Sequence, residues 1–405
     1  MSICLKDFGV VCALGDSKVS VAAGLLQGFR GGLVLDSELP NAEPQYVGRV
    51  ADSTFDKIVA GLDTDTNDKI LTRNDKLGKL AYLQIADTLA PLITEFGEQR
   101  IAVVIGTSTS GIEYGEQALK QKIATGEYPD SYHYSMQEMG TTAQFIADLC
   151  QAKGPVYSIS TACSSSGKAL VSGQALLEAD LADVVIAGGV DSLAKLTVNG
   201  FKALASTAAV QNNPFSADRD GINIGEAAAL FVMTKEQGGI QLLGAAETSD
   251  AHHLSAPHPE GEGALRAMQA ALAEAQLQGS QIDYVNLHGT GTPKNDDMEA
   301  KAMFNACGSK VLCGSSKGMT GHTLGAAGAL EAGICWLLLH DEYNPDHKVP
   351  DNVSDGEVDN SLATINLVNA KANADRTAKN KLQTCMSNSF AFGGNNISLV
   401  IGKQQ

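Results

Sequence analysis

The chain has 405 residues, of which 44% are hydrophobic and 19% are charged, and its 29 basic against 46 acidic residues give a formal net charge of -17. This length and composition allow a large buried core, exclude a mainly disordered chain, and favour two domains or two halves of one fold. The acidic balance argues against a nucleic-acid binder, because neutralising phosphates needs clustered Lys and Arg side chains.

The N-terminal residues show no basic segment followed by a long apolar stretch, and no window of the chain approaches the roughly 18 consecutive apolar residues of a membrane span. The 8 cysteines are few for this length and include no Cys-x-x-Cys pair. The sequence therefore predicts neither a disulfide framework nor a metal site. We expect a cytoplasmic protein with reduced thiols and no membrane span.

Short apolar runs rich in Val and Ile predict buried strands at 101–105, 156–159, 184–187, 284–287, 311–313 and 397–401. Helical spacing follows residue 163, covers 265–275 and follows residue 325. Strands that alternate with helices predict an α/β fold with a largely parallel, buried sheet. The pattern runs twice, and the polar stretch 235–239 lies between the two runs. We therefore predict one half at residues 1–237 and a second at residues 238–405.

Cys163 stands in the segment TACSSSG, between the strand predicted at 156–159 and the helical stretch that follows. This placement puts Cys163 at a helix N-terminus, where the helix dipole and free backbone N–H groups favour a thiolate. A free cysteine is most often a buried structural residue. The other cysteines lack this setting, however, so Cys163 is the candidate nucleophile.

Two histidines follow later predicted strands in loops rich in Gly and Thr: His288 in NLHGTGTP and His322 in SSKGMTGH. Ligands of open α/β sheets gather outside the carboxyl ends of the strands. Each histidine alone would more often be a structural hydrogen-bonding residue, but the two together are candidate site residues. Lys317 and Glu331 are either solvated charges or, if both are buried, an ion pair, because an unpaired buried charge is costly.

The segment SNSFAFGGNN before the last predicted strand suits a tight turn whose backbone N–H groups could bind a phosphate or an oxyanion. The chain has no Gly-x-x-x-x-Gly-Lys-Ser/Thr loop and no Gly-x-Gly-x-x-Gly after a strand, which counts against an NTPase or a dinucleotide enzyme. His252, His253 and His258 match no metal-binding spacing and are interpreted as loop residues.

Together these segments resemble the elongating β-ketoacyl-acyl carrier protein synthases, condensing enzymes of the thiolase superfamily. The match covers nearly the whole chain and rests on TACSSSG, PFSADRDGINIGEAAAL, NLHGTGTP, SSKGMTGHTLGAAGALEA and SNSFAFGGNN, in the family's order. The resemblance implies a thiolase-like fold of two similar βαβ-rich halves, layered αβαβα. The Cys-His-His set also implies decarboxylating elongation, since thiolases carry a second Cys in place of one His and initiating synthases carry an Asn.

The family's catalytic roles carry over onto matching positions. The resemblance implies that Cys163 holds the acyl chain as a thioester, with the backbone N–H groups of Cys163 and Phe392 forming the oxyanion hole. His288 and His322 would bind the malonyl thioester and favour the loss of carbon dioxide. Neutral imidazole N–H groups aimed at a developing enolate would stabilise charge that exists only in the transition state. Lys317 and Glu331 would be the supporting ion pair.

The resemblance also implies a binding site for the phosphopantetheine arm of an acyl carrier protein, with no separate cofactor. Thr290, Thr292 and Ser255 would bind the arm, Phe392 would gate the acyl tunnel, and Thr109 would line the acyl pocket. Asp296 matches a carboxylate of the family that supports the site.

Two positions depart from the family's usual pattern. Ala391 replaces a Gly between the two aromatic residues of the last motif, which puts the mobility of that loop in doubt. Thr109 replaces an apolar residue of typical fatty-acid synthases, which would suit a more polar or differently shaped acyl chain. The Thr-Ser-Thr-Ser-Gly run at 107–111 and TACSSSG are similar to ketosynthases of aryl polyene gene clusters.

The expected partners are an acyl carrier protein and a second subunit, either an identical chain or a ketosynthase-like chain-length factor. An acidic carrier protein requires basic residues at its docking face, and the candidates are Arg73, Lys76, Lys79 and Lys202. The alternative function is a partner subunit of the chain-length-factor type, without condensing activity of its own. Cys163 argues against it, since such subunits lack the cysteine. His322 argues against a coenzyme A-dependent thiolase.

Overall fold

The structure is a computed structural model that describes residues 3–41, 43–56, 71–374 and 381–403. Eleven strands of these residues form one large sheet. They are β1 (Ile3–Cys12), β4 (Ile101–Gly106), β5 (Val156–Ile159), β6 (Val184–Asp191), β8 (Ala227–Thr234), β9 (Ile240–Ser249), β10 (Tyr284–Asn286), β11 (Leu312–Gly314), β12 (Asn366–Leu367), β13 (Thr384–Phe390) and β14 (Asn395–Lys403). A small sheet contains β2 (Leu33–Asp36), β3 (Gln45–Gly48) and β7 (Ile224–Gly225).

The described residues form the following α-helices, several of which cover the two faces of the large sheet. They are α1 (Lys18–Leu26), α3 (Arg73–Leu83), α4 (Ala86–Phe96), α5 (Ile112–Thr125), α6 (Thr141–Cys150), α7 (Ser165–Glu178), α8 (Lys195–Ala203), α9 (Glu262–Glu274), α10 (Pro293–Cys307), α11 (Lys317–Thr320), α12 (Ala327–Leu339) and α13 (Ala370–Ala374). No helix among the described residues is long and apolar enough to cross a membrane.

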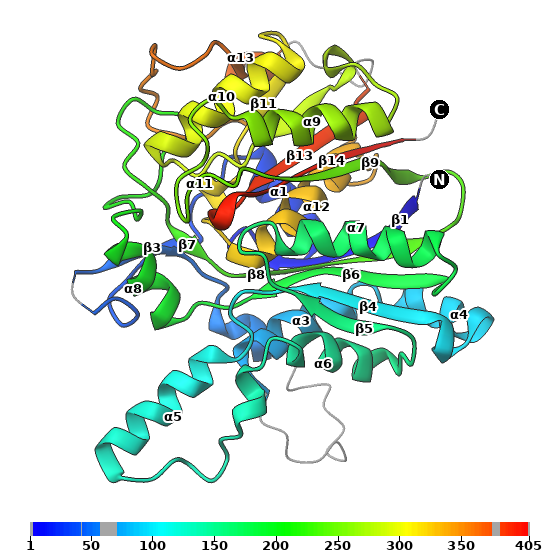
Figure 1. The fold of residues 1–405 in the computed structure, drawn as a ribbon, viewed down its shortest axis with the longest axis vertical. Coiled ribbons are helices and arrows are strands. Elements are labelled where there is room, and N and C mark those ends of the chain that lie inside the picture. The colour runs from blue at the N-terminus through cyan, green and yellow to red at the C-terminus, as the bar shows by residue number, and fades with distance from the viewer. Residues whose placement is uncertain (1–2, 42, 57–70, 375–380, 404–405) are drawn as a thin grey trace.

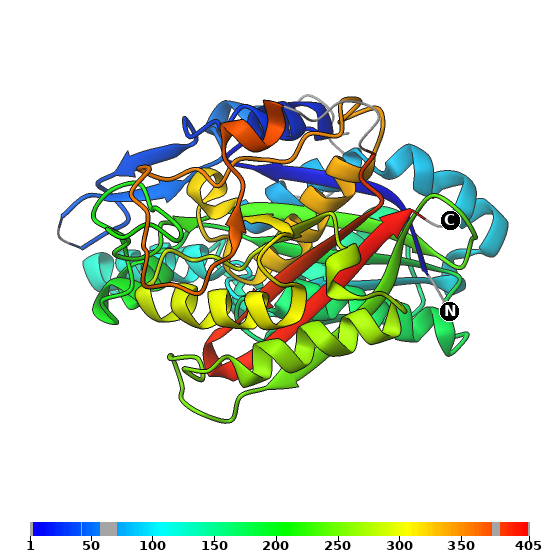
Figure 2. The same cartoon turned by 90° about the horizontal axis from the view of Figure 1, so that it is seen from above.

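The large sheet has two parts joined by a narrow contact. The strand order is β12-β11-β10-β13-β14-β9-β1-β8-β6-β4-β5, and β9 meets β1 through two residue pairs, Ile3 with Leu242 and Cys4 with Gln241. In Figure 1, α7 and α12 lie between the two parts, α9 and α10 cover the upper part, and α3 and α6 cover the lower part. Figure 2 shows α9 and α10 in front of the red strands β13 and β14. The layers are αβαβα, as expected.

The two parts of the sheet repeat one pattern. In the first, β4 pairs in parallel with β5 and β6, and β8 and β1 follow as antiparallel neighbours. In the second, β10 pairs in parallel with β11 and β13, and β14 and β9 follow as antiparallel neighbours. This repetition supports two similar halves. The boundary after residue 237 falls in the loop between β8 and β9 and stays a prediction.

The helix α12 is buried on every side, which its sequence AGALEAGICWLLL explains because only Glu331 is charged. It packs against α7 and against strands of both parts of the sheet. Small residues permit this approach: a Cβ atom on Gly328 would lie 2.7 Å from the backbone N of Gly167 in α7, and one on Gly333 would lie 1.9 Å from the ring of Phe8. The two halves therefore share one core, and α7 and α12 form its middle layer.

All six strands expected from the apolar runs are present, as β4, β5, β6, β10, β11 and β14. The expectation of a largely parallel sheet is wrong, because five of the ten neighbouring strand pairs among the described residues are antiparallel. No clear sequence pattern predicts β8, whose AAALFVMT is rich in Ala, or β13, whose TCMSNSF is polar. These strands are central, and burial on both faces permits residues that strand propensity alone disfavours.

Candidate active site

Cys163 lies in a sharp turn between β5, which ends at Ile159, and α7, which begins at Ser165. Ala162 adopts a left-handed backbone conformation, with φ of 55°. The hydroxyl of Ser165 stabilises this conformation, since it accepts a hydrogen bond from the N–H of Thr161 at 2.8 Å and donates one to the carbonyl of Ala162 at 2.6 Å. The turn therefore presents the Cys163 side chain just ahead of the helix, as the sequence predicts.

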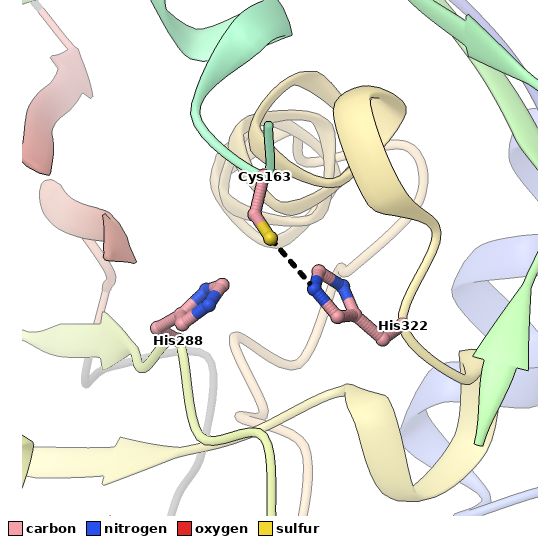
Figure 3. Close-up of side chains that lie close together, drawn as sticks. All are labelled: Cys163, His288 and His322. Carbon is pink, nitrogen blue, oxygen red and sulfur yellow. Dashed lines mark hydrogen bonds between the residues drawn. The ribbon is translucent and has the colours of Figure 1, made fainter. Parts of the chain in front are cut away.

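The structure brings Cys163 together with His288, which follows β10, and His322, which follows β11 and α11. Figure 3 shows both rings directed toward the sulfur. Nε2 of His322 lies 2.9 Å from Sγ of Cys163. The two imidazole rings are 5.4 Å apart between centroids and nearly perpendicular, at 87°. All three side chains are at most 4% exposed. Three segments distant in the sequence thus form one buried cluster.

Lys317 contacts both the ring and the backbone of His288. Its ammonium lies 3.3 Å from Nδ1 of His288 and donates to the carbonyl oxygen of His288 at 2.6 Å. It also pairs with the carboxylate of Glu331. Lys317 and Glu331 are both buried, so the alternative of solvated charges is wrong. Burial raises the pKa of Glu331 to about 7, although Lys317 acts in the opposite direction.

Burial and the nearby positive charge of Lys317 keep both histidines neutral. Burial, and then the positive charge of Lys317, hold the pKa of His288 and that of His322 well below the usual 6.5. Because a lysine ammonium can only donate hydrogen bonds, Nδ1 of His288 is an acceptor. The single proton of the neutral ring of His288 is therefore on Nε2. This N–H has no hydrogen-bond partner among the described residues, so it can donate to a ligand.

The free thiol of Cys163 is not the thiolate that the helix N-terminus led us to expect. Burial raises the pKa of Cys163 to about 11. Lys317 and the backbone N–H groups of Phe392 and of Cys163 itself act against burial, but they do not outweigh it. The sulfur must therefore lose its proton during the reaction, and His322 is adjacent to it.

A cavity of about 270 Å³ leads to the cluster. Four residues expected to contact the pantetheine arm or the acyl tunnel line it together with the cluster: Thr290, Thr292, Ser255 and Phe392. The hydroxyls of Thr290 and Thr292 lie 2.9 Å apart. Thr109 is buried and is absent from this lining, and its hydroxyl donates to Asp191 instead.

The loop after β13 closes one side of the cavity. Ala391 has φ of -93° and ψ of 156°, an extended conformation that any residue adopts, so its replacement of Gly costs no backbone strain here. The positive φ angles of this loop fall on Gly393 and Gly394. The N–H of Gly393 is bonded to the carbonyl of Leu254, which leaves the N–H of Phe392 as the group directed at the sulfur.

Two buried carboxylates of α10 shape the loop that carries His288. Glu299 accepts the backbone N–H groups of His288 and Gly289, each at 2.7 Å. Asp296, expected in this role from the resemblance, accepts those of Phe215 at 2.7 Å and Gly291 at 3.2 Å. Sequence reasoning missed Glu299. Its position three residues after Asp296 on one helix face was the available signal.

The expected basic docking face is only partly present. The prediction that Arg73 is a docking residue is wrong, because its guanidinium donates two hydrogen bonds to the buried carboxylate of Glu226. Lys76 and Lys79 lie half-buried on the same helix, α3. Lys202 lies on α8, whose Phe201 lines the cavity. Lys294 at the start of α10 is exposed and also lines the cavity, although it was not among the expected docking residues.

The ligand atoms of Cys163, His288 and His322 lie within 4.8 Å of one another, close enough to hold a metal ion. Thiol and imidazole are ligands that zinc accepts. The ammonium of Lys317, 3.3 Å from Nδ1 of His288, opposes a divalent cation at this position. The expected absence of a metal stays a prediction.

Known proteins match this chain over its full length. The model of the Beta-ketoacyl synthase N-terminal domain matches residues 87–238, and that of the C-terminal domain matches residues 240–348. The 3-oxoacyl-[acyl-carrier-protein] synthase 2 of Vibrio harveyi is 30% identical over 99% of this chain and 98% of its own length.

Solved structures of beta-ketoacyl synthases are also similar to this chain in sequence and fold. A chain of the complex of the ketosynthase ApeO with its chain length factor ApeC from Xenorhabdus doucetiae is 38% identical, with a TM-score of 0.88 over 100% of this chain and 98% of that one. A beta-ketoacyl synthase from Burkholderia phymatum is 25% identical, with a TM-score of 0.80 over 100% of both chains. These matches confirm the thiolase-like fold expected from the motifs. The chain belongs to the beta-ketoacyl synthase family of condensing acyltransferases.

Proposed function

We propose that this chain is a β-ketoacyl-acyl carrier protein synthase that condenses malonyl-acyl carrier protein, with loss of carbon dioxide, onto an acyl group held by Cys163. The observation that carries this proposal is the buried cluster of one thiol and two neutral imidazoles, with 2.9 Å between Sγ and Nε2 of His322, at the end of a cavity of about 270 Å³. A thiol supplies the nucleophile, and the imidazoles supply hydrogen-bond donors for an enolate.

In the first half-reaction the sulfur of Cys163 attacks the thioester carbonyl of an acyl carrier protein. The negative charge that develops on the carbonyl oxygen needs donors, and the backbone N–H groups of Cys163 and Phe392 are the pair available beside the sulfur. The thiol proton has His322 as its nearest partner and ends on the departing pantetheine thiol. The acyl group is then a thioester of Cys163.

In the second half-reaction a malonyl thioester occupies the same cavity. Its carbonyl oxygen accepts hydrogen bonds from Nε2–H of His288 and from Nε2–H of His322, because the single ring proton of His322 moves from Nδ1 to Nε2 once the acylated sulfur no longer donates to Nε2. Breaking the bond to the carboxylate releases carbon dioxide and leaves an enolate, whose carbon attacks the acyl thioester. Collapse of this adduct releases the sulfur of Cys163 as a thiolate, which takes up one proton from water to restore the thiol. Lys317 and Glu331 position His288.

Both substrates arrive on the phosphopantetheine arm of an acyl carrier protein, so no separate cofactor is required. Thr290, Thr292 and Ser255 line the entry to the cavity and suit the amides and hydroxyl of this arm. Lys294 lines the cavity and Lys202 follows Phe201, which also lines it, so both lysines suit an acidic carrier. We place the reaction in the cytoplasm, as the sequence predicts, and in an aryl polyene type of pathway because of the TACSSSG and Thr-Ser-Thr-Ser-Gly segments.

The partner is a chain-length-factor subunit in a heterodimer. The 38% identity to a chain of a ketosynthase–chain length factor complex supports this choice over a homodimer. The surface also supports a partner: β5 is the last strand of the large sheet, and α5, which projects from the body in Figure 1, exposes Leu119 by 50% and Ile123 by 78%. Light scattering that gives an active monomer at micromolar concentration would contradict this part of the proposal.

Intact-mass analysis with candidate acyl carrier protein thioesters tests the proposed function. We expect one acyl group on the wild-type chain, located on Cys163 by peptide mapping, and none on Cys163→Ala. An equal adduct on both proteins would contradict the role of Cys163. A chain that takes up no acyl group, with or without its partner subunit, would favour the alternative of a non-condensing subunit.

A further inference from the structure

The helix α8 and the residues that follow it form one wall of the cavity mouth. Phe201, near the end of the helix, lines the cavity together with Leu204, Ala205 and Ser206. The ring of Phe201 also packs against that of Phe392, with 5.4 Å between centroids and an angle of 37° between the ring planes. Phe392 belongs to the loop after β13, which closes another side of the cavity. The placement of α8 therefore decides where this aromatic pair stands.

The helix α8 has little apolar packing of its own. Val198 is the one buried residue among its nine, and it packs against the small sheet, beside which α8 lies in Figure 1. Leu196 is 59% exposed. Asn199 adds one hydrogen bond, from its amide to the carbonyl oxygen of Leu39 at 3.0 Å. A helix of this length is marginal in water unless other contacts hold it.

The N-terminus of α8 is capped by a side chain from another helix. The N-cap residue of α8 is Ala194, which has no side-chain acceptor to offer. Glu116 of α5 takes this part: its Oε2 atom accepts the backbone N–H of Lys195 at 3.0 Å, and its Oε1 atom accepts that of Leu196 at 2.6 Å. A carboxylate at this place also suits the positive end of the helix dipole. Both oxygens of Glu116 are therefore used to hold α8.

A second carboxylate holds the chain just before α8. The Oε2 atom of Glu226 accepts the backbone N–H of Leu193 at 3.3 Å. Glu226 is fully buried and paired with Arg73, so it fixes the end of the preceding segment to the body of the protein. Glu116 is half-buried and belongs to α5, which projects from the body. Glu226 thus anchors the approach to the helix, whereas Glu116 anchors the helix itself.

We infer that Glu116 is a positioning residue that caps α8 from α5 and thereby holds Phe201 against Phe392 at the mouth of the cavity. This inference rests on the proposed function, in which thioester substrates pass this mouth to reach Cys163. Glu116 is not among the residues that line the cavity, so it acts through α8. Its loss should lower the fraction of molecules whose cavity wall is in place. Such a loss raises KM but not the rate at saturation, because bound substrate favours the complete wall.

The variants for the test remove the cap and then restore it from within α8. Glu116→Ala removes both acceptors. Ala194→Ser can replace them, because Ala194 has φ of -141° and ψ of 151°, close to the -155° and 158° of Ser17, whose side chain caps α1. Glu116→Gln keeps one acceptor oxygen. Glu274→Ala is the matched control, since Glu274 also accepts a backbone N–H, that of Ala245 at 2.9 Å, but does not line or adjoin the mouth through α8.

The measurement is acyl transfer to Cys163 from a saturated acyl pantetheine thioester, read by intact mass at increasing thioester concentration. Glu116→Ala should raise KM roughly fivefold, the scale of one lost helix cap, and leave the rate at saturation at its wild-type value. Amide hydrogen exchange at residues 195–206 should become faster. Glu116→Gln should give an intermediate KM, and Ala194→Ser added to Glu116→Ala should return KM and exchange toward the wild type. Glu274→Ala should leave both unchanged.

The inference is overturned if Glu116→Ala leaves KM unchanged, or if the rate at saturation falls as much as kcat/KM does. It is also overturned if neither Ala194→Ser nor Glu116→Gln improves on the KM of Glu116→Ala. A changed oligomeric state of Glu116→Ala by light scattering would show that Glu116 acts on the partner surface and not on α8. In all these cases the wild type is still acylated on Cys163 and the proposed function stands. A wild-type chain that takes up no acyl group contradicts the proposed function itself.

Discussion

The turn that carries Cys163 and the loops that carry the histidines are held in different ways. Around the cysteine, neutral hydroxyls brace a strained backbone, as Ser165 does for Ala162. Around the histidines, buried charged groups hold the loops in place: Glu299 accepts two backbone N–H groups, and Lys317 pairs with Glu331. The groups that hold the turn of Cys163 therefore do not titrate, whereas the histidine side carries groups whose protonation affects both stability and chemistry.

The largest effect should follow from removing the nucleophile. Cys163→Ala should abolish condensation, because no acyl-enzyme forms, while some decarboxylation of malonyl-acyl carrier protein persists, because both imidazoles remain. The measurement is carbon dioxide release alongside the mass of the carrier-bound product. Condensation at the wild-type rate in this variant would remove Cys163 from the mechanism.

The histidines should affect the second half-reaction most strongly. His288→Ala should lower condensation by roughly 10²–10³, the scale for one preorganised donor, and leave acyl transfer to Cys163 largely intact. His322→Ala should lower condensation similarly and also slow acyl transfer, since Nε2 of His322 is 2.9 Å from the thiol. Single-turnover acylation and full turnover, measured separately, check this difference. Unchanged condensation in either variant would exclude that histidine.

Substitutions in the buried Lys317–Glu331 pair can separate its effect on stability from its effect on catalysis. Lys317→Met leaves Glu331 buried without a partner, and we expect a loss of about 3–5 kcal/mol in the free energy of unfolding. The double variant Lys317→Met with Glu331→Leu should recover most of that stability and none of the condensation activity, because His288 still lacks the ammonium. Denaturant unfolding and turnover of both variants are the measurements. Recovered activity in the double variant would show that the pair acts only on folding.

Acid should destabilise the protein through the buried histidines. The pKa of each histidine is lower in the folded state than in the unfolded state. Below about pH 6.5 the unfolded chain therefore binds more protons than the folded chain. The stability that is present above this pH is lost as the pH falls. Each histidine contributes up to about 1.4 kcal/mol per pH unit in this range. His322→Asn should flatten the fall in melting temperature between pH 7 and pH 5. A curve parallel to that of the wild type would contradict the neutral, buried state of His322.

The smallest effect concerns docking of the carrier. Lys202→Glu with Lys294→Glu should raise KM for a carrier-bound substrate several-fold and reduce its salt dependence, while activity with a small pantetheine thioester is retained. Lys79→Glu on α3 is the control, since α3 does not line the cavity. Equal losses with both substrate forms would place the docking surface elsewhere.

The sequence predicted the parts of this molecule that depend on local pattern. Apolar runs located six strands, and the Gly-rich loops after them contained Cys163, His288 and His322. The sequence did not predict the pKa shifts and long-range ion pairs that arise only when the chain packs. Burial raises the pKa of Cys163 to about 11, against the thiolate expected from the helix N-terminus. The partner of Arg73 is Glu226, 153 residues away, and no helical spacing reveals it.

The motifs also did not show which contacts individual residues make or which backbone conformation they adopt. Thr109 was identified by its position, but the direction of its hydroxyl depends on Asp191, which lies 82 residues later. Ala391 suggested a strained loop, and the structure gives it an ordinary extended backbone. Glu299 accepts the backbone N–H of His288, and its spacing from Asp296 indicates a shared helix face without showing this contact. These contacts become visible only once the strands place their carboxyl ends together.

The most direct test of the account is a single turnover on a pre-acylated enzyme. The chain, with its partner subunit, is acylated on Cys163, freed of excess substrate and mixed with malonyl-acyl carrier protein. If Cys163 and the two histidines catalyse condensation, the adduct on Cys163 disappears, one carbon dioxide is released per adduct, and the carrier holds the acyl group lengthened by two carbons. Release of carbon dioxide while the adduct stays on Cys163 and the carrier shows no lengthened chain would contradict this mechanism.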